Sequence, residues 1–130
     1  MDSASARQLG LAPTGHAARG GSGAPSVSSS NVHLAAGSTT PQALMADIVD
    51  GIYVTELIGH GVNGVTGDYS RGASGYRIVD GEITGPVAEF TVAGNLVDMF
   101  RALTPANDLE WHRTINVPTI RIDGMTVAGD

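Results

Sequence analysis

The sequence contains neither cysteine nor lysine. Without cysteine, the chain can form no disulfide and can offer no thiolate ligand to a metal. All seven basic residues are arginines, and they are spread from Arg7 to Arg121 without a basic run. Nucleic-acid binding depends on clustered positive charge. The net charge of −6 and the scattered arginines therefore argue against direct binding to DNA or RNA.

Long apolar runs are also missing. No stretch approaches the ~18 continuous apolar residues of a membrane-spanning helix, and the first residues lack the basic and then apolar pattern of a signal peptide. We therefore expect a cytoplasmic protein without a membrane partner. Charged residues make up only 15% of the chain, against a usual ~25%. So little charge indicates a surface that is partly covered, as in an oligomer or in a piece of a larger protein.

The first 38 residues are poor in bulky apolar side chains. Residues 14–30 consist mostly of small residues with glycine and proline between them. This composition fits either a flexible linker or an extended ordered segment that leads into a strand over residues 30–37. We assign residues 1–38 to this irregular or extended lead-in and residues 39–130 to a single domain.

The first expected helix lies near residues 40–50. Thr39 or Thr40 can serve as its N-cap, Pro41 suits its first turn, and Gly51 is expected to end it in a left-handed conformation. Its apolar stripe consists of Leu44, Met45 and Ile48.

A second helix is expected after Asn95, which is a suitable N-cap residue with Asp98 three positions later. Pro105 should prevent the helix from continuing. The helix is expected to bury an apolar face made of Leu96, Met99, Phe100 and Leu103.

The remaining pattern is that of strands and hairpins. Residues 52–58 form one expected strand, and residues 75–79 and 82–92 form a hairpin around Asp80-Gly81, a dipeptide typical of type I′ turns. A second Asp-Gly hairpin, at Asp123-Gly124, is expected within residues 118–129. Pro86 should mark a bulge or a sheet edge. Because helices do not alternate regularly with strands, the sequence predicts an α+β, β-rich domain with two short helices and two Asp-Gly hairpins.

The glycine-rich stretch over residues 61–76 matches no known phosphate-binding or nucleophile motif. It lacks the Gly-Lys-Ser/Thr of a P-loop, the G-x-G-x-x-G spacing and the G-x-S-x-G elbow. We interpret it as a bend that glycines permit between a strand and a hairpin. Asp68 and Arg71 could pair across this bend. The stretch is also the most site-like part of the chain, and we expect a peptide-binding or interface surface made of Asn63, Thr66, Asp68, Ser70 and Arg71.

One candidate metal site is present in residues 108–112. In an extended conformation Asp108, Glu110 and His112 would point to one side, and such a trio could hold a divalent metal. The alternative is that these carboxylates are solvated on a loop, with Trp111 in a core or an interface. No H-E-x-x-H motif accompanies them.

Four segments of the chain resemble the C-terminal part of the TldD/PmbA family, in which PmbA is also called TldE. They are "TGHAARGGSGAPSVSSSNVHL", "DGIYVTELIGHGVNGVTGDYSRGASGYRIVDGEI", "EFTVAGNLVDMF" and "PTIRIDGMTVAG". The resemblance covers essentially the whole chain in order. Within the family, "GDYSRGASGY" resembles the PmbA/TldE side.

The resemblance implies one half of a cytosolic, heteromeric metallopeptidase that cleaves small or unfolded peptides, also known as a modulator of DNA gyrase. Zinc in such an assembly is held by the TldD-like partner, through a histidine helix upstream of this region and a cysteine. This chain has neither, so no zinc ligand or catalytic residue carries over to it and no cofactor is expected in it. Family members are longer, so an upstream domain is expected to be absent here. The alternative is a stand-alone peptide- or protein-binding module without peptidase activity.

An assembly of this kind should leave apolar side chains without a partner inside the chain. We expect some of five residues to be exposed for this reason: Val54, Leu57, Ile58, Val62 and Trp111.

Overall fold

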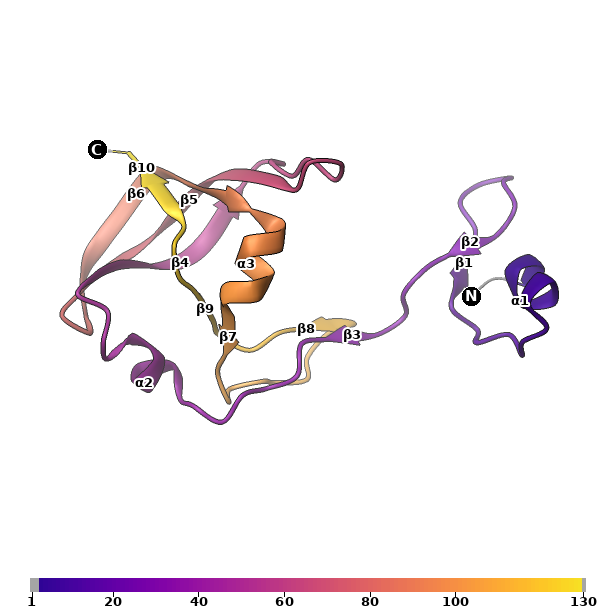
Figure 1. The fold of residues 1–130 in the computed structure, drawn as a ribbon, viewed down its shortest axis with the longest axis horizontal. Coiled ribbons are helices and arrows are strands. Elements are labelled where there is room, and N and C mark those ends of the chain that lie inside the picture. Colours follow the sequence, from indigo (N-terminus) through magenta and orange to yellow (C-terminus); the bar gives the residue numbers. More distant parts are fainter. Residues whose placement is uncertain (1–2, 130) are drawn as a thin grey trace. The chain divides into compact units, whose positions relative to one another are not determined.

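A computed structural model of the protein describes residues 3–129, which fall into two compact units (Figure 1). The first unit comprises residues 3–33 and 111–116, and the second comprises residues 34–110 and 117–129. Within the described residues, no helix is both long and apolar enough to cross a membrane. Strands predominate over three short helices, so the predicted α+β, β-rich class is confirmed.

The first unit begins with a helix that the sequence analysis missed. Helix α1 spans Ser3–Leu9 and buries Ala6. Alanine, arginine, glutamine and leucine are all good helix formers, and this signal was overlooked among the small residues that follow. Strands β1 (Ala17–Ala18) and β2 (Ser26–Val27) then pair antiparallel as a short ladder.

The first unit also contains a parallel pair formed by distant segments. Strand β3 (Val32–His33) pairs with β8 (Ile115–Asn116), so the strand expected over residues 30–37 is reduced to two residues. Asn116 is buried, and its side-chain oxygen accepts hydrogen bonds of 2.9 Å from the backbone N–H groups of His112 and Arg113. The Asn116 side-chain nitrogen donates to the Arg113 carbonyl at 2.6 Å, so both ends of the buried amide are satisfied and the turn before β8 is fixed.

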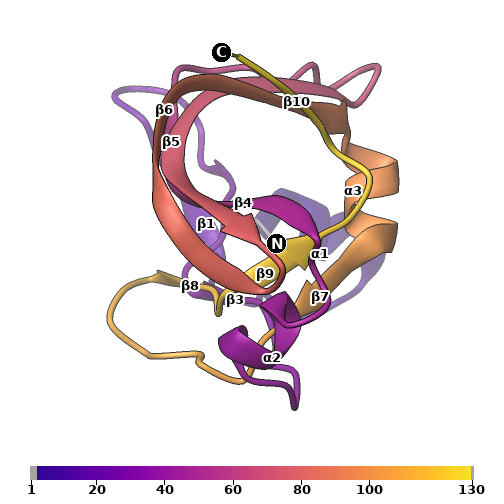
Figure 2. The ribbon, with the colours of Figure 1, turned by 90° about the vertical axis from the view of Figure 1, so that its left-hand side faces the viewer.

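The second unit is built on a four-stranded antiparallel sheet in the order β10-β6-β5-β4, which is strongly curled (Figure 2). Its strands are β4 (Asp50–Ile58), β5 (Asp68–Val79), β6 (Glu82–Asn95) and β10 (Thr126–Ala128). The β5–β6 ladder runs from Asp68 opposite Asn95 to Val79 opposite Glu82. A separate two-stranded pair consists of β7 (Leu103–Pro105) and β9 (Ile120–Ile122).

The Asp80-Gly81 turn between β5 and β6 is confirmed as type I′. Asp80 has φ 48° and Gly81 has φ 82°, and positive φ at both central residues defines this turn. Its right-handed twist matches that of the flanking strands, which explains why Val79 and Glu82 stay paired up to the turn.

Two irregularities lie along β6 near Pro86, as expected from this proline. The register shifts between Arg77 and Ile78 and again between Ala73 and Gly75. Glu89 has φ 62° at the second shift, which is unusual for a residue with a side chain. Strand β10 pairs with β6 only at residues 91–93, so among the described residues Pro86 also lies at a sheet edge. Bulges of this kind increase bending and twist, which explains the curled sheet.

Helix α2 (Pro41–Met45) has the predicted start but not the predicted end. The Thr40 hydroxyl accepts a hydrogen bond of 3.2 Å from the Ala43 N–H, so Thr40 is the N-cap. The helix ends at Met45, and Gly51 belongs to β4 instead of serving as a C-terminal cap. A side chain on Gly51 would lie 2.7 Å from the Ile48 side chain. Glycine at this position therefore permits packing and does not provide a left-handed turn.

Helix α3 (Leu96–Ala102) is capped by Asn95 as predicted, through a 3.1 Å hydrogen bond from the Val97 N–H to the Asn95 side-chain oxygen. The predicted buried face is wrong. The helix buries none of its residues, and Phe100 is 72% exposed. Leu103 lies outside the helix, in β7. The periodicity showed which residues share a face but not that this face is only partly covered, with Leu96 and Met99 half-buried.

The second predicted hairpin is also wrong. Strand β9 pairs with β7 and strand β10 pairs with β6, so the segments on either side of Asp123-Gly124 belong to different sheets. Gly124 has φ 78°, but Asp123 has no positive φ, which excludes a type I′ turn. The Asp123 carboxylate instead accepts a 2.8 Å hydrogen bond from Arg121. The dipeptide redirects the chain from one sheet to another.

The core of the second unit is thin. Its central cluster consists of Ala73, Phe90 and Val92, with Ile52 and Met125 packed against it among others. Of the described residues, no large side chain is less than 2% exposed. A domain with so little deeply buried apolar area has a small hydrophobic contribution to stability.

Replacing Gly81 with valine should destabilise the chain by about 1 kcal/mol or more, because a β-branched residue resists φ 82°. The new Cβ would also lie 2.8 Å from the Ala46 carbonyl oxygen. Gly85→Val is the matched control, because no atom lies within 4 Å of a Cβ at Gly85. Urea unfolding measures both variants. Equal stability of the two variants would contradict the turn assignment.

Candidate functional site

The loop between β4 and β5 is held in one conformation by Asn63. The Asn63 side-chain oxygen accepts hydrogen bonds from the Val65 and Thr66 N–H groups at 3.0 and 3.2 Å. The Asn63 backbone is also tied to the loop: its N–H donates to the Asp68 carbonyl and its carbonyl accepts from Gly67, both at 2.8 Å. Asparagine is well suited to such turns because its side chain can replace a backbone acceptor.

Two further polar residues of the predicted set lie on this loop. The Thr66 hydroxyl donates a 2.6 Å hydrogen bond to the Asp68 carboxylate, and the Asp68 N–H lies 3.3 Å from the same hydroxyl. The structure therefore brings Asn63, Thr66 and Asp68 together. Their polar atoms bond mainly within the loop, so they fix its shape while their side chains remain exposed.

Asn95 anchors this loop to helix α3, a role that the sequence analysis missed. The Asn95 side-chain nitrogen donates to the Thr66 carbonyl at 3.0 Å, while its oxygen caps α3. The Leu96 N–H donates to the Gly67 carbonyl at 2.7 Å. The loop thus supplies acceptors to the first turn of the helix, where N–H groups otherwise lack partners. The capping signal at Asn95 was visible in the sequence, but its second partner was not.

Ser70 and Arg71 do not join this group. Successive residues of β5 point to opposite faces, so Arg71 points away from the face that carries Asp68 and Ser70. The Ser70 N–H donates to the Gly61 carbonyl at 2.7 Å. Arg71 donates from Nη2 to the Leu57 carbonyl at 3.0 Å, and not to Asp68. Its buried Nε has no hydrogen-bond partner within residues 3–129, so Arg71 retains an unused donor.

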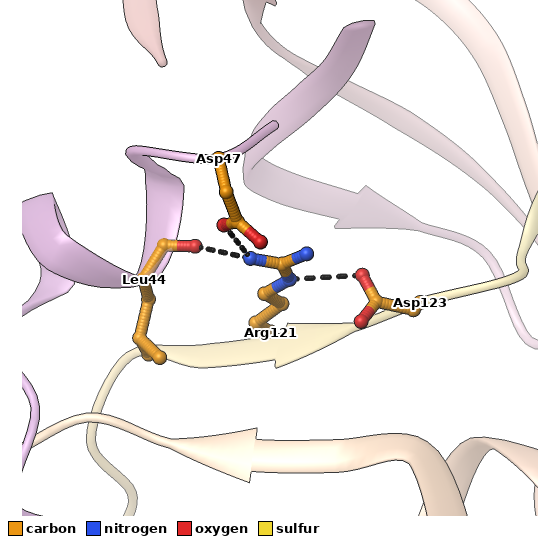
Figure 3. Close-up of polar contacts among 4 residues, drawn as sticks. All are labelled: Leu44, Asp47, Arg121 and Asp123. Atoms are coloured by element: carbon orange, nitrogen blue, oxygen red, sulfur yellow. Dashed lines mark hydrogen bonds and ion pairs between the residues drawn. The ribbon is translucent and has the colours of Figure 1, made fainter. Parts of the chain in front are cut away.

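Arg121 forms the best-connected polar cluster of the second unit (Figure 3). Its Nη1 donates to the Leu44 carbonyl at 2.7 Å and to the Asp47 carboxylate, while its Nε donates to Asp123 at 2.8 Å. The Arg121 side chain is 22% exposed. Strand β9 is thereby joined to α2 and to the turn that follows it. Nothing in the sequence indicated this partnership, because the paired residues are 74 and 77 positions apart.

The charges of this cluster stabilise one another. The hydrogen bond from Arg121 lowers the pKa of the Asp47 carboxyl below its ordinary value of 3.8. The two carboxylates, Asp47 first and Asp123 second, raise the pKa of the Arg121 guanidinium. The Arg121 guanidinium and the Asp47 carboxylate are therefore ionised across the physiological pH range. With one positive and two negative groups, this cluster offers no free cation to an anionic ligand.

The second unit has two hollows, the first of which lies beside this cluster. The first, of about 450 Å³, is lined by α2, β4 and β9, with Arg121 among its residues. The second, of about 510 Å³, is lined by β4, β6 and β10. Both hollows share residues Asp50, Gly51, Ile52, Met125 and Val127. The volumes of both hollows are within the roughly 300–1,000 Å³ range of ligand pockets.

The candidate metal trio is not assembled. Among the described residues, no three His, Cys, Asp or Glu side chains lie close enough together to hold a metal ion. The Asp108 carboxylate accepts hydrogen bonds from the Thr119 N–H at 2.9 Å and from the Thr119 hydroxyl at 2.7 Å. The Thr119 hydroxyl is the main cause of a lowered pKa of the Asp108 carboxyl. Asp108 therefore has a structural role, in closing the segment between β7 and β9.

The apolar residues expected to lack a partner are exposed, as predicted. Their exposed fractions are 37% for Val54, 39% for Leu57, 58% for Ile58, 55% for Val62 and 64% for Trp111. Trp111 contacts the His33 ring, with 4.8 Å between ring centroids. Several further apolar side chains are exposed, most of all Val65, at 96%. The side chains of Val54, Leu57 and Ile58 lie on the edge strand β4.

Comparisons with known proteins show which family of domains the chain matches. Residues 1–129 match the family described as the PmbA/TldA metallopeptidase C-terminal domain. The chain is 42% identical to Metalloprotease PmbA of Escherichia coli O157:H7 over 99% of its length, and it spans 27% of that relative. Among solved structures, a protein of Thermotoga maritima described as a candidate modulator of a DNA gyrase matches 98% of the chain at 28% identity, with a TM-score of 0.79. The chain covers 29% of that structure.

A third match concerns the fold alone. The structure of TldE from Thermococcus kodakarensis is 24% identical and has a TM-score of 0.78 over 95% of the chain, which covers 29% of TldE. Together these findings define a β-rich domain of the kind found at the C-terminus of metallopeptidases. The chain belongs to the PmbA/TldD family, and it corresponds to the C-terminal domain of that family.

Gly61→Ala should disrupt the loop between β4 and β5. A Cβ at this position would lie 1.5 Å from the Ser70 carbonyl oxygen, so the backbone would have to move. We expect a loss of about 1–3 kcal/mol in the free energy of unfolding and faster amide exchange over residues 63–70. Gly64→Ala is the control, because a Cβ there meets nothing within 4 Å. An unchanged exchange pattern in Gly61→Ala would show that the loop is not held as described.

The Asp47–Arg121 contact should give a pH-dependent contribution to stability. Because the pKa of Asp47 is lowered by folding from 3.8, its contribution is present above pH 3.8 and is lost as the pH falls through the lower, folded-state pKa. Asp47→Asn should therefore lower Tm at neutral pH, and the difference from wild type should shrink below pH 3.8. The difference is expected to be small, because Asp47 is 74% exposed.

The control for this measurement is Asp98→Asn. Asp98 pairs with Arg101 at 3.6 Å, and both side chains are more than three-quarters exposed. Such surface pairs contribute little to stability, so Tm should barely change at any pH. A Tm difference between Asp47→Asn and wild type that does not change with pH would contradict this dependence of stability on the ionisation of Asp47.

Proposed function

We propose that this chain is the C-terminal domain of a PmbA/TldE-like subunit that holds no zinc itself. In this proposal the subunit joins a TldD-like partner in the cytoplasm, and the pair cleaves small or unfolded peptides with zinc bound by the partner. The observation that carries the proposal is the match of residues 1–129 to the family, together with 42% identity to a protein named Metalloprotease PmbA.

The chemistry of the chain supports a subunit without zinc. The sequence contains no cysteine to serve as a thiolate ligand. The Asp108 carboxylate, the first member of the only candidate trio found in the sequence, is engaged by Thr119 at 2.7 and 2.9 Å. Binding a metal through Asp108 would require both of these hydrogen bonds to be replaced.

The surface of the chain supports an assembly. Charged residues are scarce, and β4 exposes three apolar side chains, Val54, Leu57 and Ile58. Apolar side chains that are exposed together on one strand can form part of a protein–protein contact. The loop that contains Asn63, Thr66 and Asp68 is fixed by its internal hydrogen bonds and by Asn95. We propose that this loop, with Ser70 and Arg71 beside it, meets the peptide or the partner chain.

This proposal predicts zinc-dependent peptidase activity only in the presence of a TldD-like subunit. The chain should be mixed with a TldD-like subunit from the same genome, and complex formation should be measured by analytical ultracentrifugation. Zinc in the complex should equal the zinc carried by the partner alone, and the chain alone should bind no zinc after zinc loading. A chelator should abolish cleavage of an unfolded test peptide, because the proposed chemistry is metal-assisted hydrolysis.

His112→Ala provides the control for metal binding. If the chain alone carries stoichiometric zinc that is lost in His112→Ala, the proposed division of roles is wrong. If the chain forms no complex and remains a monomer at every concentration, the alternative of a stand-alone binding module is favoured.

A further inference from the structure

The loop between β4 and β5 contains the one Asn-Gly pair of the sequence, Asn63-Gly64. The side-chain carbon of an asparagine can be attacked by the backbone nitrogen of the next residue, and this attack closes a succinimide ring. A side chain on the next residue hinders the approach, so glycine permits it best. Both residues are exposed, and a Cβ at Gly64 would meet nothing within 4 Å. The surroundings therefore do not shield the attacking nitrogen.

The attacking and the leaving nitrogen are both free of hydrogen bonds to the protein. Within residues 3–129 the Gly64 N–H donates to no acceptor, although the amides on either side of it, those of Asn63 and Val65, both do. The Asn63 side-chain nitrogen likewise has no partner among these residues, because only its oxygen is engaged. The reaction therefore breaks no hydrogen bond at either nitrogen.

The Asn63 side-chain oxygen is held by donors that suit the charge of the intermediate. The Val65 and Thr66 N–H groups donate to it at 3.0 and 3.2 Å. When the Gly64 nitrogen adds to Cγ of Asn63, this oxygen becomes the oxyanion of a tetrahedral intermediate. Backbone N–H groups that are already in place stabilise such an oxygen, as they do in the oxyanion holes of enzymes. The hydrogen bonds that fix the loop therefore also favour the attack.

The other asparagines lack this combination. Asn116 is buried, and both ends of its side-chain amide are hydrogen-bonded. Both ends of the Asn95 side chain are also bonded, and the next amide, that of Leu96, donates to the Gly67 carbonyl. Each of the four is followed by a residue with a side chain, which hinders ring closure. They are Asn31, Asn95, Asn107 and Asn116.

We propose that Asn63 is a site of spontaneous modification in the folded protein, and that isoaspartate formed there releases the loop from helix α3. In the first step the Gly64 nitrogen loses its proton to solvent and bonds to Cγ of Asn63. The Cγ–Nδ2 bond breaks, and the amide nitrogen takes up a proton and leaves as ammonia. In the second step water adds to one of the ring carbonyl carbons, and the bond from that carbon to nitrogen breaks. Opening at Cγ leaves aspartate, and opening at the main-chain carbonyl leaves isoaspartate.

Isoaspartate alters the backbone as well as the charge. The chain then runs through Cβ and Cγ of residue 63 and gains a backbone atom, while the former main-chain carbonyl becomes a carboxylate on a side branch. That carbonyl accepts the 2.8 Å hydrogen bond from the Gly67 N–H. The Gly67 carbonyl in turn accepts from the Leu96 N–H at 2.7 Å. The Thr66 carbonyl accepts from the Asn95 side chain at 3.0 Å. A shift of the loop therefore removes acceptors from the start of α3.

The first test measures where and how fast the chain is modified. The whole chain is incubated at mildly alkaline pH, well below its Tm, beside a sample kept unfolded in urea. Peptide mapping by mass spectrometry and labelling with protein isoaspartyl methyltransferase locate the product. Isoaspartate should form at residue 63 of the folded chain faster than at any other asparagine, at a rate no more than about tenfold below that of the unfolded chain. Greater protection of Asn63 by folding, or faster reaction at another asparagine, would overturn the proposal.

Matched variants identify the attacking nitrogen. Gly64→Ala places a methyl group beside this nitrogen and leaves the loop intact, because the space is open and Gly64 has no positive φ. It should slow the modification of residue 63 by about tenfold or more. Gly85→Ala is the control, because Gly85 also has open space and no positive φ but lies in β6. Equal rates in the two variants would contradict attack by the Gly64 nitrogen.

The last test asks whether isoaspartate releases the loop. Amide exchange at Gly67 and Leu96 should be about tenfold or more faster in the incubated chain than in the fresh chain, and unchanged in incubated Gly64→Ala. The methyltransferase with S-adenosylmethionine returns isoaspartate to aspartate through the succinimide, and it should restore slow exchange. Asn63→Asp adds the charge without lengthening the backbone, so it should exchange like the fresh chain.

Two results would show that the release is wrong. One is slow exchange at Gly67 and Leu96 in a chain that contains isoaspartate at residue 63. The other is exchange in Asn63→Asp as fast as in the incubated chain, because the added charge and not the longer backbone would then open the loop.

Discussion

Pairing between β5 and β6 is the interaction on which the second unit depends. The ladder begins at Asp68 opposite Asn95 and ends at Val79 opposite Glu82. At one end it brings Asn95 beside the loop from β4, and at the other the type I′ turn fixes the register. Both neighbouring strands, β4 and β10, are added to this pair. Because the core is thin, the backbone hydrogen bonds of this ladder hold the unit together to an unusual degree.

Glycines of β5 and of the loop that precedes it determine how closely neighbouring backbone segments approach. A side chain at Gly75 would lie 2.1 Å from the Tyr53 carbonyl oxygen, and one at Gly61 would lie 1.5 Å from that of Ser70. The glycine-rich sequence is thus explained by close backbone contact and not by a ligand cradle. Only some of these glycines have positive φ, such as Gly59 and Gly67 at the ends of the loop. Some of these positions therefore need glycine because a neighbouring backbone lies close, and others need it because φ is positive.

The sequence correctly predicted those features that depend on local interactions alone. Thr40 and Asn95 cap their helices, and Asp80-Gly81 forms its turn, because each depends on residues within a few positions. The wrong predictions concern elements whose structure depends on residues that are distant in the sequence. Asp123-Gly124 resembles a hairpin turn, but the strand after it pairs with β6 instead of β9. Phe100 has helical spacing with Leu96, but its side chain is largely exposed. Of the predicted site, Asn63, Thr66 and Asp68 come together, whereas strand alternation separates Arg71.

The Arg121 cluster has a consequence for the order in which the chain can fold during synthesis. The Leu44 carbonyl and the Arg121 guanidinium that binds it are 77 positions apart. A ribosome releases the chain from its N-terminus, so α2 emerges long before its anchor exists. Until β9 has been made, this short helix has only its cap and local packing to hold it, and helices of this length are marginal alone. The region around α2 should therefore be the last part of the second unit to become protected on the nascent chain.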